Sequence, residues 1–161
     1  MTVQVLNIEE KHRMGPGDHA SLLDFTVSEG DTTEDDRILL QLNVSLYCLD
    51  DATRRAIFVE LPADLDLSTA PFVYGMQYEQ AQRLLAVPYE TFQQVARTLP
   101  QVGKLILVYI SGRSGSTLLS HILNELDGVL SLSEPDVANQ FVHLRALDGS
   151  RDAELREIRG E

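Results

Sequence analysis

The stretch KLILVYISGRSGSTLLSHILNEL, Lys104 to Leu126, decides the fold of the second part of this 161-residue chain. The run from Leu105 to Ile110 is apolar on both alternating faces, which is typical of a strand that is covered on both sides in a parallel sheet. From Leu118 to Leu126, leucine and isoleucine recur at helical spacing. A short polar loop separates these two runs, so the stretch predicts a strand, a loop and a helix.

A second apolar run begins near Val129, in GVLSLSEP, and predicts another strand. A right-handed β-α-β crossover then accounts for residues 104 to 133. The predicted fold class of this part is therefore α/β, with the start of a parallel sheet.

The loop SGRSGS has the composition of an anion-binding site. Gly112 and Gly115 permit positive φ angles and close backbone approach, while the first N–H groups of the helix and its dipole favour a negative charge. Three hydroxyl side chains and one guanidinium accompany the glycines: Ser114, Ser116, Thr117 and Arg113. Such donors suit an oxyanion. The alternative is a tight turn in which Ser116 only caps the helix.

The loop matches neither the G-x-x-x-x-G-K-[ST] pattern, which needs a lysine before the last hydroxyl, nor the dinucleotide pattern G-x-G-x-x-G. The residues Arg113 to Thr117, RSGST, follow an apolar strand and resemble the 5'-phosphosulfate-binding loop of the sulfotransferases. The likeness is strongest to the carbohydrate and bacterial members, and Arg113 stands where the cytosolic enzymes carry lysine. The later SLSEP, Ser131 to Pro135, resembles the Glu-Pro that follows the second strand in many of these proteins.

This resemblance implies a P-loop-like α/β fold and a donor, 3'-phosphoadenosine-5'-phosphosulfate (PAPS), whose sulfuryl group passes to a hydroxyl or amine of a carbohydrate or other small acceptor. It implies donor binding by Gly112, Arg113, Ser114, Gly115, Ser116 and Thr117, without a metal. Arg113 would stabilise charge on the bridging oxygen, and Glu134 would act as general base or orient loops and acceptor. The alternatives are a phosphate- or nucleotide-binding P-loop protein such as a phosphotransferase, or a non-catalytic interaction module.

The resemblance covers only residues 104 to 137. The family's second cofactor element, an Arg and a Ser that hold the 3'-phosphate, has no counterpart, because Arg145 and Ser150 come too early in the chain. We therefore expect an amino-terminal fragment of a sulfotransferase that is inactive alone, with a complete but reduced protein as the alternative. An exposed strand edge would favour self-association.

The first hundred residues predict a small, mainly antiparallel α+β domain, with residues 101–161 as the truncated α/β domain. Strands are expected in TVQVLNI, SLLDFTV, RILLQLNVSLYCL and RRAIFVEL, the last two joined by a turn at DDATR. Residues 77–87 are ambiguous between strand and helix, whereas PYETFQQVARTL predicts a helix with Phe92, Val95, Ala96 and Leu99 on one side. PQVG, residues 100–103, is the expected domain junction.

Charge and composition exclude several classes of function. The net charge of −12 opposes non-specific binding to nucleic acid or anionic membranes. The chain shows no signal peptide and no membrane-spanning run, so a cytoplasmic protein is expected. The one cysteine, Cys48, is expected in the core. The acidic segment Ser28 to Arg37 is interpreted as a solvated loop, and the His12 and His19 pair as surface residues, rather than as metal sites.

Overall fold

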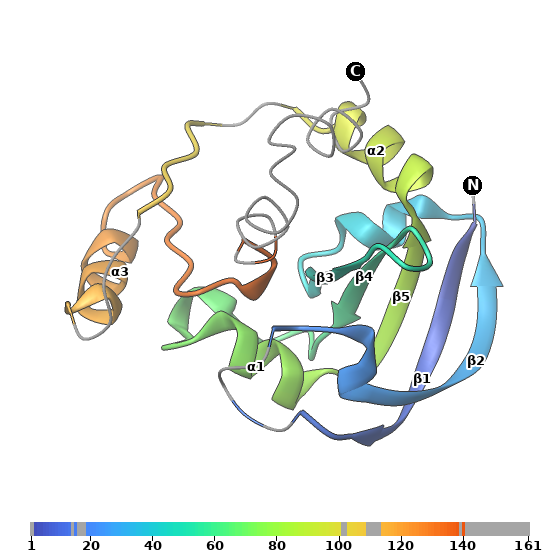
Figure 1. The fold of residues 1–161 in the computed structure, drawn as a ribbon. Coiled ribbons are helices and arrows are strands. Elements are labelled where there is room, and N and C mark those ends of the chain that lie inside the picture. Colours follow the sequence, from blue (N-terminus) through green and yellow to red (C-terminus); the bar gives the residue numbers. More distant parts are fainter. Residues whose placement is uncertain are drawn as a thin grey trace, which may run out of the picture.

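The computed structural model describes residues 2–13, 15, 19–100, 103–108, 114–138 and 140. Within these residues the protein is a mixed α/β structure built on a five-stranded sheet in the order β2-β1-β5-β4-β3 (Figure 1). Every neighbouring pair of strands is antiparallel. The expected strand-rich first part is present, and the described residues contain no parallel strand pair.

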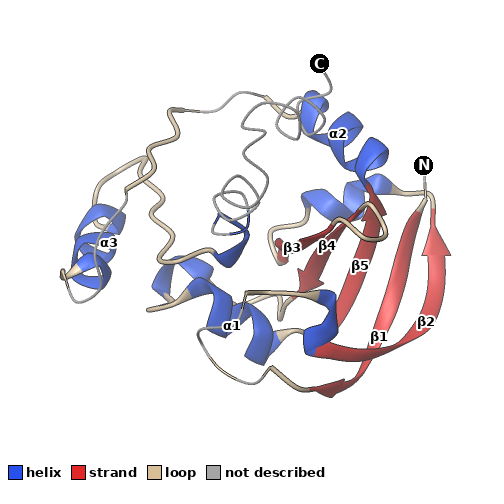
Figure 2. Cartoon of the chain, viewed as in Figure 1, coloured by secondary structure: helices blue, strands red, loops and turns tan. Residues whose placement is uncertain are grey.

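Five strands and three α-helices make up the described elements, together with three short 3-10 helices (Figure 2). The strands are β1 (Val3–Lys11), β2 (Phe25–Thr33), β3 (Val44–Asp50), β4 (Arg55–Glu60) and β5 (Arg83–Pro88). The helices are α1 (Val73–Gln80), α2 (Tyr89–Thr98) and α3 (Ser116–Asn124). The 3-10 helices are η1 (Leu22–Asp24), η2 (Asp36–Leu40) and η3 (Leu67–Thr69). No described helix has the length and apolar character needed to cross a membrane.

Apolar side chains cover both faces of the sheet. Along β5, Leu84 and Ala86 point into one cluster, and Leu85 and Val87 into the other. Tyr78 of α1 packs against the first cluster, whereas Val95 of α2 belongs to the second. Because side chains alternate along a strand, the central strands must be apolar throughout to bury both faces. α1 and α2 therefore lie on opposite faces of the sheet.

A β-bulge in β3 interrupts this alternation. The register passes from Leu46 opposite Phe58 to Cys48 opposite Ile57, which leaves Tyr47 as the extra residue. Tyr47 and Cys48 consequently both join the cluster on the α1 side. Bulges of this kind redirect a side chain, and here the bulge turns the Tyr47 hydroxyl toward buried polar groups.

The structure corrects one expectation about the first hundred residues and resolves an ambiguity in another. The acidic segment from Ser28 is not mainly a loop, because β2 continues through it to Thr33. β2 is an edge strand, and its exposed polar and acidic side chains suit an edge that must not pair with other chains. The ambiguous run 77–87 contains both structures, since α1 ends at Gln80 and β5 begins at Arg83.

The helix predicted in PYETFQQVARTL is present as α2, with Pro88 at its N-cap. Only part of its expected apolar side is buried. Phe92 and Val95 pack on the sheet, whereas Ala96 and Leu99 are exposed.

Candidate functional site

The predicted anion-binding loop ends at the amino terminus of α3. Gly112 and Arg113 lie outside the described residues, whereas Ser114 to Thr117 lie within them. Gly115 is the N-cap of α3 and adopts a left-handed conformation, with φ 85° and ψ 20°. This conformation favours glycine, because a Cβ atom would be strained at that φ.

The first turn of α3 shows whether Ser116 caps the helix. Among the described residues no side chain caps this helix, and Ser116 is its first helical residue. The alternative in which Ser116 only caps the helix therefore does not describe this turn. Uncapped N–H groups at a helix start, together with the helix dipole, can bind a negative group.

Polar side chains hold α3 against the rest of the structure. Asn124 donates from Nδ2 to the carbonyl oxygens of Ser68 and Ser131, each at 3.0 Å, and accepts from the Ser131 N–H at 2.6 Å. The hydroxyls of Ser120 and Ser131 are 3.0 Å apart. The polar side of this amphipathic helix is thus the attached side.

The apolar side of α3, expected to lie on a sheet, faces outward. Ile122 is 53% exposed, and Leu118, Leu119 and Leu126 are also exposed. Figure 1 shows α3 away from the five-stranded sheet. None of the described strands lies beneath this helix to cover it.

The predicted parallel strands on either side of α3 also differ from expectation. Residues 104–108 of the first strand form no strand, and Leu105 is 84% exposed; Tyr109 and Ile110 lie outside the described residues. Residues 129–133 of the second run form no strand either. A parallel strand needs hydrogen-bonding neighbours and covering layers on both faces. Within the described residues neither run has them.

The SLSEP segment contacts the first part of the chain instead of α3's amino terminus. The Val73 N–H, at the start of α1, donates to the Ser133 carbonyl oxygen at 2.8 Å. Glu134 is exposed, and in the described structure no hydrogen bond or ion pair joins it to residues 114–117. Its φ of 51°, directly before Pro135, is a strained backbone conformation for a residue with a side chain.

A buried polar cluster joins the segment after Pro135 to the sheet, and sequence reasoning missed it. Arg13 Nη2 donates to Asp136 Oδ2 at 3.0 Å, with the two side chains only 5% and 6% exposed. The Ala20 N–H donates to the same carboxylate oxygen. Gln140 also bridges, because it accepts from the Leu49 N–H at 2.9 Å and donates to the Ala20 carbonyl at 2.6 Å.

Tyr47 and Asp24 extend this cluster beneath the sheet. The Tyr47 hydroxyl donates to Asp24 Oδ2 at 2.6 Å. Burial, followed by this hydrogen bond, raises the pKa of Tyr47 above its ordinary range. Burial lowers the pKa of Arg13, but the nearby carboxylates of Asp136 and Asp24 outweigh it, so the pKa of Arg13 is raised as well. The arginine therefore stays charged and the tyrosine neutral.

No sequence pattern could have revealed this cluster. Arg13 and Asp136 are 123 residues apart, and each is an ordinary charged residue in a polar segment. His19, expected at the surface, is about half exposed, with Nδ1 3.9 Å from Asp136. His12 pairs instead with the Thr26 hydroxyl at 2.6 Å.

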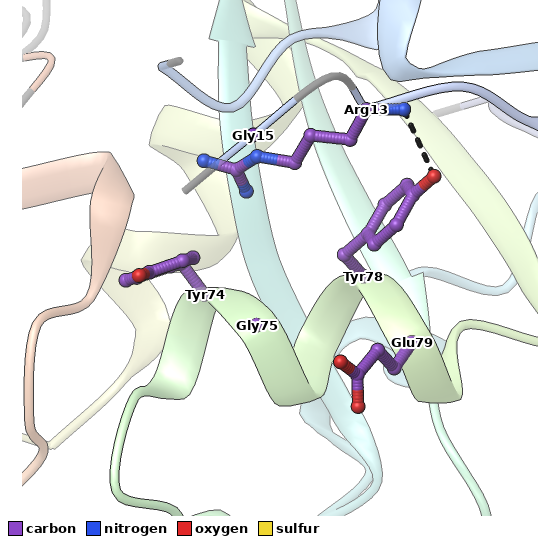
Figure 3. A pocket seen from close by; sticks show the side chains of 6 residues that line it. All are labelled: Arg13, Gly15, Tyr74, Gly75, Tyr78 and Glu79. Atoms are coloured by element: carbon purple, nitrogen blue, oxygen red, sulfur yellow. Dashed lines mark hydrogen bonds between the residues drawn. The ribbon is translucent and has the colours of Figure 1, made fainter. Parts of the chain in front are cut away.

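A hollow of about 200 Å³ opens beside this cluster, on the outward face of α1 (Figure 3). It is lined by Arg13, Gly15, Tyr74, Gly75, Tyr78 and Glu79. The part of the chain that the structure describes contains no group of three or more His, Cys, Asp or Glu side chains able to hold a metal ion.

No family model, no curated protein and no solved structure matches this chain.

Proposed function

We propose that this chain carries the 5'-phosphosulfate-binding part of a PAPS-dependent sulfotransferase, which transfers a sulfuryl group to a hydroxyl or amine acceptor. One observation carries the proposal. Gly115 takes the left-handed conformation at the N-cap of α3, and the described residues place no side-chain cap on the helix. An RSGST sequence with this geometry suits a bound oxyanion rather than a simple turn.

The proposed roles follow from the chemistry of the loop. Backbone N–H groups from Gly112 to Thr117 would hold the 5'-phosphosulfate, with hydroxyl donors from Ser114, Ser116 and Thr117. Arg113 would balance the charge on the bridging oxygen as its bond to sulfur breaks. Glu134 would accept the proton of the acceptor as the new oxygen–sulfur or nitrogen–sulfur bond forms. Strained backbone, as at Glu134, is commonly found at functional positions.

We also propose that the runs around α3 become parallel strands when neighbouring strands are supplied. This proposal rests on exposure. Leu105, Ile106 and Leu107 are 84%, 69% and 60% exposed. Burial of such apolar surface stabilises by about 25 cal/mol per Å². The apolar side of α3 would then lie on the completed P-loop-like sheet.

Donor binding by the full chain tests the proposed function. We expect calorimetric titration to show a preference for PAPS, or its product 3'-phosphoadenosine-5'-phosphate, over ATP with magnesium. Arg113→Ala should weaken this binding by at least about 10-fold, because a charge-assisted hydrogen bond to an anion is lost. Arg37→Ala, which removes one positive charge at an exposed site in η2, is the matched control.

Other results would assign the loop differently. Equal or tighter binding of ATP with magnesium would favour a phosphotransferase and contradict the sulfotransferase. A stable, monodisperse protein that binds neither nucleotide would favour the interaction module. Loss of binding in Arg37→Ala as well would mean that net charge, not the loop, controls the titration.

A further inference from the structure

The sheet ends at β3, and a later segment of the chain covers this edge. β3 is the last strand in the order β2-β1-β5-β4-β3, so among the described strands it pairs only with β4. The covering segment consists of Ser133 to Val137 together with Gln140, and we call it the strap. Figure 1 shows its orange-red ribbon beside the β3 end of the sheet, away from the β2 edge.

The sequence of β3 is that of a strand that pairs readily when its edge is open. Its seven residues, VSLYCLD, carry one acidic side chain, Asp50, at the end of the strand. β2, at the other edge of the sheet, carries Glu29 and Asp31 along its length. Charged side chains on an edge strand discourage pairing with another chain, whereas an apolar edge is a template for it. β3 therefore needs another form of protection.

Two glutamine side chains bond main-chain groups of β3. Gln140 Oε1 in the strap accepts from the Leu49 N–H at 2.9 Å. Gln77 Nε2 in α1 donates to the Leu46 carbonyl oxygen at 3.0 Å. An added strand binds to a sheet edge through main-chain groups of this kind. The two amides thus occupy hydrogen-bonding positions that a further strand would need.

The strap is anchored on both faces of the sheet. Val137 packs against the apolar cluster on the α2 side. On the α1 side, the Asp136 carboxylate accepts hydrogen bonds from Arg13 and from the Ala20 N–H. Gln140 adds a hydrogen bond of 2.6 Å to the Ala20 carbonyl oxygen. These contacts hold the strap across the β3 edge.

A second copy of the chain is the partner that this edge fits. Two β3 strands can pair antiparallel about a two-fold axis, which places the same residues on both sides of a closed dimer. In that arrangement the two Asp50 side chains lie at opposite ends of the pair, so these like charges do not face each other. Self-pairing of β2 would instead bring acidic side chains in the middle of the strand together.

We propose that the strap seals the β3 edge, and that its release allows β3 to pair antiparallel with β3 of a second copy. The sealed form prevents association through β3, and release joins the sheets of two copies into one. The proposal does not depend on the sulfotransferase proposal, because its contacts involve neither residues 112–117 nor Glu134.

Hydrogen exchange in the full chain, followed by NMR at single amides, tests the seal. Asp136→Ala combined with Gln140→Ala, the release variant, removes the polar anchors of the strap. In dilute protein, exchange at the Leu49 N–H should rise at least about 10-fold more than exchange in β5, because β5 is central and β3 is the edge. Asp64→Ala combined with Gln80→Ala is the matched control, since it removes the same two side chains at exposed positions outside the strap.

Protein concentration distinguishes a second copy from other occupants of the edge. As the release variant is concentrated, sedimentation velocity should show a dimer whose Kd is at least about 10-fold lower than that of the control. The Leu49 N–H should regain protection in this dimer, whereas the amides of β2 should not change. Protection of Leu49 at every concentration in a monomer would mean that another segment of the same chain occupies the edge, and would overturn the proposal.

Three further results also overturn it. They are unchanged exchange at Leu49 in the release variant, failure of that variant to dimerise, and a dimer in which Leu49 stays unprotected. If the release variant does not fold, Gln140→Ala alone is decisive, because it keeps the Arg13–Asp136 ion pair. Exchange at Leu49 that is no faster in Gln140→Ala than in Gln80→Ala then contradicts the seal.

Discussion

At the scale of single residues, Asp136 joins two distant parts of the chain. Its carboxylate accepts hydrogen bonds from Arg13 and the Ala20 N–H in a buried setting. Asp136→Ala removes one partner of a buried ion pair, which costs about 3–5 kcal/mol in the free energy of unfolding. Asp136→Asn keeps an acceptor oxygen and should cost less. Urea denaturation measures both changes.

Asp64→Ala is the control for this prediction, because Asp64 is exposed and should change stability by less than about 0.5 kcal/mol. Equal stabilities of Asp136→Ala and Asp64→Ala would contradict the buried contact. A loss confined to the segment after Pro135 would appear in hydrogen exchange as faster exchange there than in β5.

Two buried residues of β3 make stability depend on alkaline pH. The pKa values of Tyr47 and Cys48 are raised, chiefly by burial, from ordinary values of 10.0 and 9.0. A raised folded-state pKa gives stability that is complete below the unfolded-state pKa and declines as pH rises above it. We therefore expect the free energy of unfolding to fall above about pH 9, by up to about 1.4 kcal/mol per pH unit for each group.

Denaturation curves recorded from about pH 8 to about pH 11 check this dependence. Tyr47→Phe should lower stability at neutral pH, because the hydrogen bond to Asp24 is lost, and should make the alkaline decline shallower. An unchanged slope in this variant would show that Tyr47 does not contribute to the pH dependence.

At the scale of elements, α3 is amphipathic but attached by its polar side. Ile122 is 53% exposed, whereas Ile57 in β4 is fully buried. Ile57→Ala should cost about 2–5 kcal/mol, because it leaves a cavity between the sheet and its covering residues. Ile122→Ala should cost less than about 0.5 kcal/mol. Thermal denaturation of this isoleucine pair measures the contrast, and similar losses would mean that α3 is buried in solution.

The elements show what a sequence can and cannot predict. The periodicity of apolar residues identified β1, β4, α2 and α3. Alternation in a strand and 3.6-residue spacing in a helix depend only on residues close in sequence. The same periodicity failed for residues 104–108, since an apolar run becomes a strand only where other strands pair with it. Periodicity also missed the bulge at Tyr47, which depends on the register with β4.

Part of the candidate site could likewise be predicted from the sequence, and part could not. Glycine spacing correctly pointed to a left-handed residue at the start of α3, because Gly115 adopts it through its own backbone freedom. The Arg13–Asp136 pair could not be predicted, since it depends on how segments 123 residues apart come together. The only sequence sign of the hollow on α1 is two tyrosines and a glycine at helical spacing. These residues indicate a hollow only once Arg13 is known to lie over the Tyr74 ring.

At the scale of the whole molecule, exposed apolar residues are concentrated in one region. Among the described residues, most of the large apolar side chains that are exposed lie between Leu105 and Leu132. A concentration of exposed apolar side chains favours interaction with a partner or aggregation. One edge of the sheet, β2, is protected by its acidic and polar side chains. Association should therefore depend on the region around α3 and not on the β2 edge.

Sedimentation velocity across a concentration series tests this expectation. The wild-type chain should form larger species as concentration rises, and Ile106→Lys with Leu107→Lys should reduce them, because buried lysine at a contact is costly. Leu23→Lys is the control, since Leu23 is 85% exposed but stands in η1, outside this region. If all forms sediment identically as monomers, the exposed runs do not mediate self-association. If Leu23→Lys disrupts association as strongly as the double variant, the added charge itself is responsible and the surface around residues 105–108 has no special role.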